Sequence, residues 1–356
     1  NRYDGEVQRS RASGIYVAAS NCTVKSIYCP GFINGINLVG GERVWATTSG
    51  TFTATTLVLN ASSVKPDDYY NGWNVRIFST SNATATVIVS DYDSATNTIT
   101  FPIVSTFTGP YYYLLVGNYH TGNRVYEYKG NLNDFGILAQ YQDDLIIDDI
   151  DQEVIEQTQE LNARPHTVYF TTDVTNFFGS RWRTQSCANG HAYKFRAVNG
   201  AVLTDISSRS ARAVLAIEES SRFYVDGCAG YDIGTATFRP ECVNVVSSDD
   251  VTIKNITLRI ASTFDYASNS ALRPTALAIG DSAYTAVTKL TVTGVDTNCR
   301  GADQAFGVFI EAPSTGTHAN ITVDGISIMG DGTCSTGATV PVSSRAFSVD
   351  KLKING

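Results

Sequence analysis

The sequence predicts a mainly-β protein: a right-handed parallel β-helix (a solenoid of stacked coils) with a small antiparallel β-domain inserted in its N-terminal part and one short helix. Three observations predict this fold class. Val, Ile, Thr, Tyr and Phe are abundant and Gly is frequent, a composition that favours strands and turns over helices. A repeat of about 30 residues, the size of one solenoid coil, runs through the C-terminal half. A segment without the repeat interrupts it near the N-terminus.

The repeat joins a strand, a turn and a second strand that ends in Gly or Asn. Residues 215–227 align without a gap to residues 243–255, and copies with longer turns follow at 277–294 and 309–325. A truncated copy at 347–356 closes the chain. Two or three short strands per copy suit a β-helix, in which turns lengthen while the strands stay stacked. A leucine-rich repeat would show a Leu/Asn pattern that is missing here, and a β-propeller blade needs four strands.

Two positions mark each copy of the repeat, an apolar anchor and a residue that follows it by two. The anchors are Val225, Ile253, Val292, Val323 and Ile354, and the residues that follow are Gly227, Asn255, Gly294, Gly325 and Gly356. Gly, and less readily Asn, adopts positive φ at low cost, so the second set predicts one bend that recurs in every coil.

The same pattern returns far upstream. Val17–Ile27 matches Val245–Ile256 with one deletion, which predicts that the solenoid begins near Gly14. We therefore assign residues 1–42 to the start of the β-helix and residues 166–356 to its main part.

The interrupting segment, residues 43–120, predicts a small β-domain. Alternating apolar and polar residues mark five short strands, at 55–59, 74–78, 85–89, 97–101 and 111–116, and turn clusters at 65–68 and 91–94 separate some of them. Such a set suits a compact barrel or sandwich. A connecting segment, residues 121–165, follows. Val154, Ile155 and Leu161 permit one helix over 151–161, where acidic residues at its start suit the helix dipole.

Charge and motif content exclude several classes of partner. The formal net charge is −8 and no basic stripe is visible, so no nucleic-acid partner is expected. No run of eighteen apolar residues occurs, so no membrane insertion is expected. The four histidines lack metal-ligand spacing and no phosphate-binding glycine loop is present, so neither a metal nor a cofactor is expected. The seven cysteines, an odd and sparse set, are expected to be free and mostly buried thiols.

Some segments resemble bacteriophage tail proteins. Residues 67–77, DDYYNGWNVRI, resemble a DDYYNGW segment of small β-domains in those proteins, and residues 87–93 stand where a TITDYD-like strand follows it. Residues 143–166, with a DDxxID start and an RP ending, are similar to a phage structural-protein segment, and the repeat resembles the pectate-lyase-like β-helix of phage tailspikes. The GDGxTDDT segment that commonly opens this β-helix is missing.

The resemblance implies a homotrimeric tailspike or tail fibre. Such proteins lie in the virion tail, are extracellular, contact other tail proteins, and bind and often cleave host surface polysaccharide. Two alternatives stay open on the sequence: a secreted monomeric polysaccharide lyase or hydrolase, and a non-enzymatic adhesin or virion structural protein. A lyase would need Asp clusters for calcium and an arginine base, which Asp249 and Asp250 with Arg259 or Arg273 approach weakly.

Three carboxylates are the candidate catalytic residues. Glu218 and Glu311 occupy one column of the repeat, directly after the inward Ile217 and Ile310. Asp281 lies one position further on in the coil next to that of Glu311, so their backbones should be about 6 Å apart, one strand spacing combined with one residue rise. Two carboxylates suffice for glycoside hydrolysis. The competing interpretation is a solvated acidic surface, which Glu219 and Asp249 would share.

Aromatic side chains could form a platform for a sugar ring. Phe177, Trp182 and Tyr193 are the candidate substrate-binding residues, with Phe178 beside them and Trp73 and Tyr111–Tyr113 on the inserted domain. A core or trimer-contact role is the competing interpretation for each.

Overall fold

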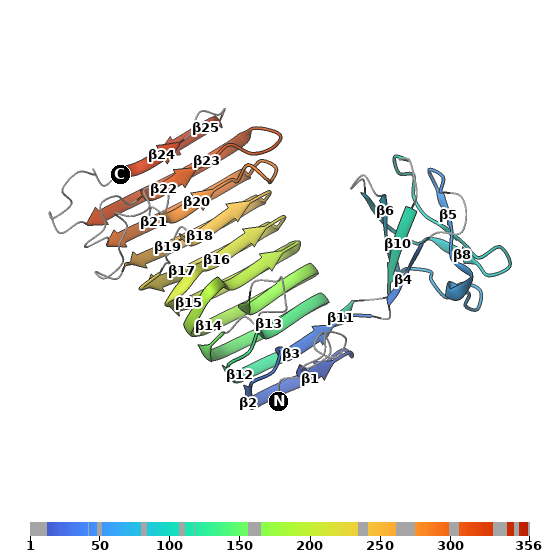
Figure 1. Ribbon diagram of the computed structural model, residues 1–356. Coiled ribbons are helices and arrows are strands. Elements are labelled where there is room, and N and C mark those ends of the chain that lie inside the picture. Colours follow the sequence, from blue (N-terminus) through green and yellow to red (C-terminus); the bar gives the residue numbers. More distant parts are fainter. Residues whose placement is uncertain are drawn as a thin grey trace. The chain divides into compact units, whose positions relative to one another are not determined.

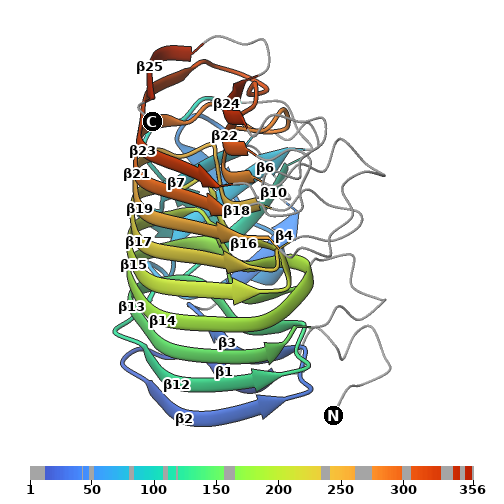
Figure 2. The ribbon, with the colours of Figure 1, turned by 90° about the vertical axis from the view of Figure 1, so that its left-hand side faces the viewer.

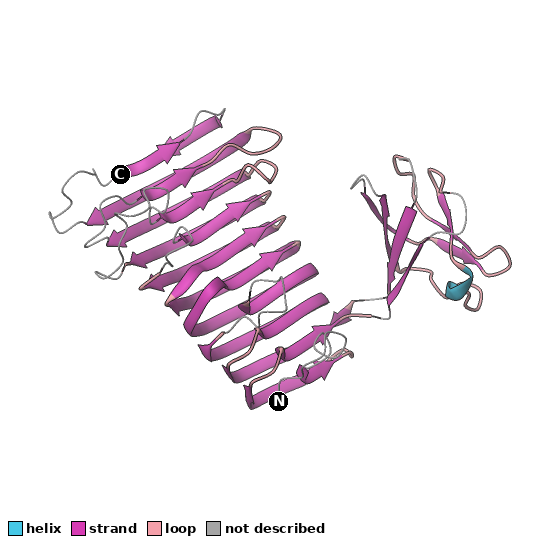
Figure 3. Ribbon diagram, in the orientation of Figure 1, coloured by secondary structure: helices cyan, strands magenta, loops and turns pink. Residues whose placement is uncertain are grey.

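The computed structural model describes two compact units, one formed by Asn1–Val39 with Thr121–Gly356 and the other by Gly40–His120. Strands dominate both (Figures 1 and 3). The residues described are 13–41, 43–47, 52–79, 84–106, 111–117, 119–155, 165–233, 241–260, 275–298, 306–329, 340–344 and 349–354.

The larger unit is a parallel β-helix, which confirms the predicted fold class. All the strand pairs described in it are parallel, and Figure 2 shows the coils stacked from β2 at the bottom to β25 at the top. Its strands are β1 Ser13–Val17, β2 Thr23–Pro30, β3 Asn34–Val39, β11 His120–Thr121, β12 Arg124–Asn131, β13 Phe135–Val154, β14 His166–Arg196, β15 Val198–Arg209, β16 Ala211–Glu218, β17 Ser221–Tyr231, β18 Glu241–Val246, β19 Asp249–Arg259, β20 Thr275–Ile279, β21 Thr288–Asn298, β22 Phe306–Ile310, β23 His318–Met329, β24 Val340–Ser344 and β25 Val349–Ile354.

The apolar anchors of the repeat stack in one column inside the coils, as predicted. Val225 pairs with Ile253, Ile253 with Val292, Val292 with Val323, and Val323 with Ile354. The first four of these side chains are fully buried. Burial of one such apolar side chain stabilises the fold by roughly 1.5–3 kcal/mol, and the column repeats that gain at each of these four residues.

The bend that follows the anchors is also confirmed in the described coils. Gly227, Asn255, Gly294 and Gly325 have φ of 80°, 58°, 74° and 70°. Lower coils place other residues at the same bend, which the strand register identifies as Ser26, Glu127, Asp149, Arg181 and Asp205, all with positive φ. A left-handed residue with a Cβ costs roughly 1–2 kcal/mol. The stacking of neighbouring coils therefore overrides local preference here.

Residues 121–155 form coils of the β-helix and are not a connecting segment. β12 pairs with β2 and β13, and β13 pairs in turn with β14. The helix expected over 151–161 is wrong for residues 151–155, because β13 runs to Val154 and Ile155 bridges to Asn133. Buried Ile150 and Gln152 alternate with exposed or half-exposed neighbours, which is the period of a strand. Residues 156–164 lie outside the described part of the chain.

The smaller unit contains two antiparallel sheets, ordered β4-β10-β6-β7 and β5-β9-β8. Its elements are β4 Arg43–Thr47, β5 Thr56–Val58, the 3-10 helix η1 Ala61–Ser63, β6 Asn74–Ser79, β7 Thr84–Ile88, β8 Asp91–Asp93, β9 Thr98–Thr100 and β10 Tyr111–Val116. The five expected strands are present. The expected turn at 91–94 is instead mostly strand β8, because Tyr92 is buried against Tyr70, with ring centroids 4.8 Å apart.

Within the described residues, no helix is long and apolar enough to span a membrane.

Candidate functional site

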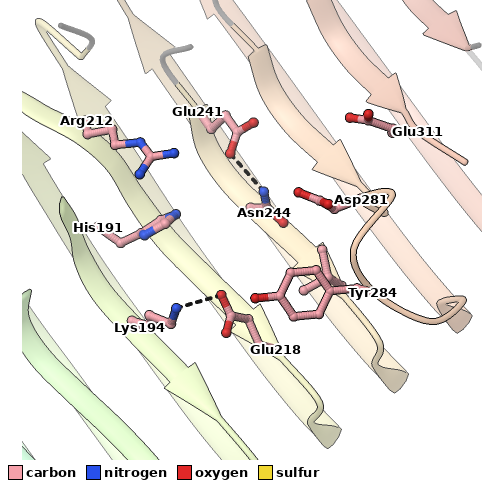
Figure 4. Close-up of a pocket in the computed structure, with 10 residues that line it drawn as sticks. His191, Lys194, Arg212, Glu218, Glu241, Asn244, Asp281, Tyr284 and Glu311 are labelled. Atoms are coloured by element: carbon pink, nitrogen blue, oxygen red, sulfur yellow. Dashed lines mark hydrogen bonds and ion pairs between the residues drawn. The ribbon is translucent and has the colours of Figure 1, made fainter. Parts of the chain in front are cut away.

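A cleft of about 320 Å³ opens on the outside of the β-helix, over the strands β14, β16, β18, β20 and β22 (Figure 4). This volume lies at the lower end of small-molecule sites, which span roughly 300–1,000 Å³. Nearly all of its lining side chains are polar or charged. They are His191, Lys194, Arg212, Glu218, Glu241, Asn244, Val246, Asp281, Tyr284 and Glu311.

The stacking of the coils brings the three predicted carboxylates together in this cleft. Ile217, Val245, Ile279 and Ile310 form one continuous buried column across four neighbouring strands. Side chains alternate between the two faces of a strand, so the residue after each inward position turns outward. Glu218 and Glu311 follow directly, and Asp281 follows one residue later.

Glu218 is the most deeply buried of the three predicted carboxylates, with 6% of its surface exposed. Lys194, from the neighbouring coil, lies with Nζ 2.9 Å from Oε1 of Glu218. The Oε2 atom of Glu218 is buried and has no hydrogen-bond partner among the described residues. One oxygen of this carboxylate is thus fixed by a cation, and the other has no such contact.

Asp281 begins a tight turn that carries Tyr284 back into the cleft. The Ala283 amide donates to Oδ1 of Asp281 at 2.8 Å, and the Tyr284 amide donates to the Asp281 carbonyl oxygen at 3.0 Å. Figure 4 shows the Tyr284 hydroxyl pointing toward Glu218. Burial, and then the negative charge of Glu218, raise the pKa of Tyr284 above its ordinary value, so its hydroxyl is protonated at neutral pH.

Glu311 is held to the coil below through its backbone. Its amide donates to the Ile279 carbonyl oxygen at 2.8 Å. The buried His318 accepts the Val287 amide at Nδ1 (3.0 Å), which places its proton on Nε2 and lets that atom donate to the Glu311 carbonyl oxygen at 2.8 Å. Gly280 passes so close that a Cβ there would lie 2.4 Å from the same oxygen.

The structure adds site residues that the sequence did not indicate. Glu241 is 7% exposed and accepts a 2.8 Å hydrogen bond from Nδ2 of Asn244. His191, Lys194 and Arg212 supply the basic side of the cleft. No group of three or more His, Cys, Asp or Glu side chains in the described part of the chain is arranged to hold a metal ion.

The predicted aromatic platform is wrong, because its three rings lie in the core. Trp182 and Tyr193 are 0% exposed and Phe177 is 2% exposed. Trp182 packs on Tyr193 and Phe177 with ring centroids 5.3 and 5.8 Å apart. Its indole N–H donates to the Ile147 carbonyl oxygen at 3.0 Å. A sugar cannot reach these faces.

The other acidic residues of the predicted cluster lie outside the cleft lining. Glu219 is exposed and pairs with Arg196 at 2.8 Å, and Asp249 accepts a hydrogen bond from the Thr288 hydroxyl. The solvated-surface interpretation therefore fits these two residues, whereas Glu218, Asp281 and Glu311 line the cleft.

No protein-family model and no curated protein matches the sequence. Among solved structures, the chain is similar to the Gp54 tailspike of the Acinetobacter baumannii bacteriophage AP22, determined in complex with A. baumannii capsular saccharide. The two are 12% identical over 98% of this chain, with a TM-score of 0.39, and the chain spans 65% of that tailspike's length. The A-module of the Azotobacter vinelandii mannuronan C-5 epimerase AlgE6 is also similar. It is 12% identical over 97% of this chain and 93% of its own, with a TM-score of 0.30. At this level of similarity the function has to be argued from the cleft itself.

Proposed function

We propose that this chain binds a polysaccharide in the cleft over β14–β22 and hydrolyses it with carboxylates of that cleft. The observation that carries the proposal is that Glu218, Asp281 and Glu311, which are far apart in sequence, line one polar cleft. Carboxylates that share a cleft supply the acid and the base, or the acid and the nucleophile, of glycoside hydrolysis.

Asp281 and Glu311 are the pair best placed for the reaction. They follow the directly paired Ile279 and Ile310, so their backbones are about 6 Å apart. Glu218 lies two coils before Asp281, about 10 Å along the stack, and forms one wall of the cleft. In this proposal one carboxyl of the pair protonates the glycosidic oxygen, and the other attacks the anomeric carbon or activates water.

Backbone and side-chain contacts preorganise the pair. The Ala283 amide fixes Oδ1 of Asp281, while His318 fixes the backbone that carries Glu311. Groups held in place before substrate binds do not pay an ordering cost during the reaction.

The chain in this proposal is a module of a trimeric virion tailspike or tail fibre, outside the host cell, that recognises host surface polysaccharide. The phage-like segment at residues 67–77 and the parallel β-helix that carries the cleft support this assignment.

The test is release of oligosaccharides from purified bacterial surface polysaccharides, measured by size-exclusion chromatography. Asp281→Asn and Glu311→Gln should each reduce release at least about a hundredfold, the scale of general acid–base catalysis. Glu219→Gln, which changes an exposed carboxylate outside the cleft lining, is the matched control and should keep full release. Full release by both cleft variants would refute the catalytic part of the proposal. Light scattering tests the trimer, and a monomer in solution would count against a tailspike.

A further inference from the structure

Glu218 presents one carboxylate oxygen for which the described part of the chain supplies no partner. Lys194 occupies Oε1, whereas Oε2 is buried and receives no donor. A buried carboxylate oxygen without a donor costs roughly 1–3 kcal/mol or more. The side chain lines the cleft, so a bound molecule can supply the missing donor once the carboxylate turns Oε2 toward it, because that oxygen itself has almost no exposed surface.

The cleft of about 320 Å³ beside Glu218 leaves room for such a molecule. Asn244, which pairs with Ala216 and Ala278 in the register, lines the cleft, whereas these two alanines are buried beneath it. Tyr284, with its protonated hydroxyl, stands opposite and offers a second polar contact.

The charges of the lining define what the molecule can be. Four carboxylates line the cleft, Glu218, Glu241, Asp281 and Glu311, against the two permanent cations Lys194 and Arg212. Lys194 is already paired with Glu218. The lining holds more carboxylates than permanent cations, so a further anion would be repelled, whereas a hydroxyl, an amide N–H or an ammonium group would be attracted.

We infer that Oε2 of Glu218 accepts a hydrogen bond from the bound sugar. The cleft therefore selects a sugar unit that is neutral or carries an amino or acetamido group, and it disfavours a uronate. This inference rests on the proposed polysaccharide-binding function. It assigns Glu218 a specificity-determining contact, distinct from the reacting pair Asp281 and Glu311.

The experiment uses the full chain with Asp281→Asn, so that bound polysaccharide is not degraded. Binding is measured to three immobilised classes of bacterial polysaccharide: neutral, amino- or acetamido-bearing, and uronate-bearing. We expect binding to the first two classes. Adding Glu218→Gln should weaken it about tenfold or more, the effect of losing a hydrogen bond to a charged group. Adding Glu219→Gln should leave binding unchanged, and circular dichroism confirms that each variant is folded.

The outcomes separate this inference from the proposal on which it rests. Binding confined to uronate-bearing polysaccharides, or binding that Glu218→Gln leaves unchanged, would overturn the inference while polysaccharide binding itself stands. Failure to bind any of the three classes would overturn both.

Discussion

The Nζ atom of Lys194 lies 2.9 Å from Oε1 of Glu218, on the next coil of the β-helix, and both side chains are mostly buried. Removing one partner of such a pair leaves a buried charge, which is far more costly than the pair itself is stabilising. Lys194→Met should therefore lower the free energy of unfolding by about 3 kcal/mol. The double variant Lys194→Met/Glu218→Gln should recover much of that loss in urea titrations. A double variant no more stable than Lys194→Met would mean that the two side chains are not coupled.

Gly280 is expected to tolerate no side chain, because of its positive φ and because it lies close to a neighbouring backbone oxygen. Gly280 and Gly316 both have φ of +82°, but a Cβ at Gly280 would lie 2.4 Å from the Glu311 carbonyl oxygen, while a Cβ at Gly316 has its nearest neighbour at 3.3 Å. Both Ala variants carry the conformational cost, roughly 1–2 kcal/mol. Gly280→Ala should lose more stability than Gly316→Ala, as measured by thermal unfolding. Equal losses would contradict the close approach.

The pKa of Tyr284 depends on the charge of the cleft. Burial and then Glu218 raise its pKa, and Arg196, Asp281 and Glu219 make smaller contributions. Its titration, followed by NMR of labelled tyrosine, should have a midpoint above the ordinary value of about 10. Glu218→Gln removes a negative charge that opposes formation of the phenolate, so the midpoint should fall. Glu127→Gln, on a different strand outside the cleft, is the control. A midpoint that does not respond to Glu218→Gln would contradict the arrangement in Figure 4.

Phe177 and Phe178 are adjacent in β14 and face opposite sides of the strand. Phe177 is 2% exposed and Phe178 is 41% exposed. Truncation of a buried Phe to Ala costs about 3–5 kcal/mol, whereas surface substitutions stay within about 0.5 kcal/mol. Phe177→Ala should therefore shift the urea midpoint strongly and Phe178→Ala only slightly. The reverse order would mean that the strand is turned over in this coil.

Thiol accessibility should differ sharply between two cysteines. Burial raises the pKa of Cys187 to about 12, whereas Cys22 is half-buried. Only the thiolate reacts with alkylating reagents, so at pH 8 the folded protein should be labelled at Cys22 and not at Cys187. Peptide mapping by mass spectrometry compares the two within one sample, and labelling in denaturant is the control. Rapid labelling of Cys187 in the folded protein would contradict its burial.

The periodic parts of the fold could be predicted from the sequence, because the period has a physical cause. Val225 and Ile253 stack because these neighbouring coils present apolar side chains at the same place, and the Gly and Asn bends follow from the positive φ there. The same register predicts that Glu218, Asp281 and Glu311 lie on one face of the β-helix.

Other features are decided by the pairing of strands in neighbouring coils and cannot be recognised in the sequence. Phe177 and Phe178 look alike in sequence, and only the pairing of β14 with its neighbours decides which one points inward. Glu241 begins a strand rather than ending one, so the column that revealed the other carboxylates could not include it. Residues from Asp151 onward belong to strand β13 and not to the expected helix, because β12 and β14 pair with this strand on its two sides.

The parallel strands of the β-helix that lie on either side of the smaller unit in the sequence pair with one another, and the described strands β4–β10 of that unit form separate sheets. The Asn21 amide donates to the Thr121 carbonyl oxygen at 2.8 Å, β2 pairs with β12, and β3 pairs with β13. The entropic cost of closing a loop grows only slowly with its length. A different module could thus occupy the place between Val39 and His120 without any coil being rebuilt, so recombination at these two points can exchange one attached domain for another while the cleft is inherited intact.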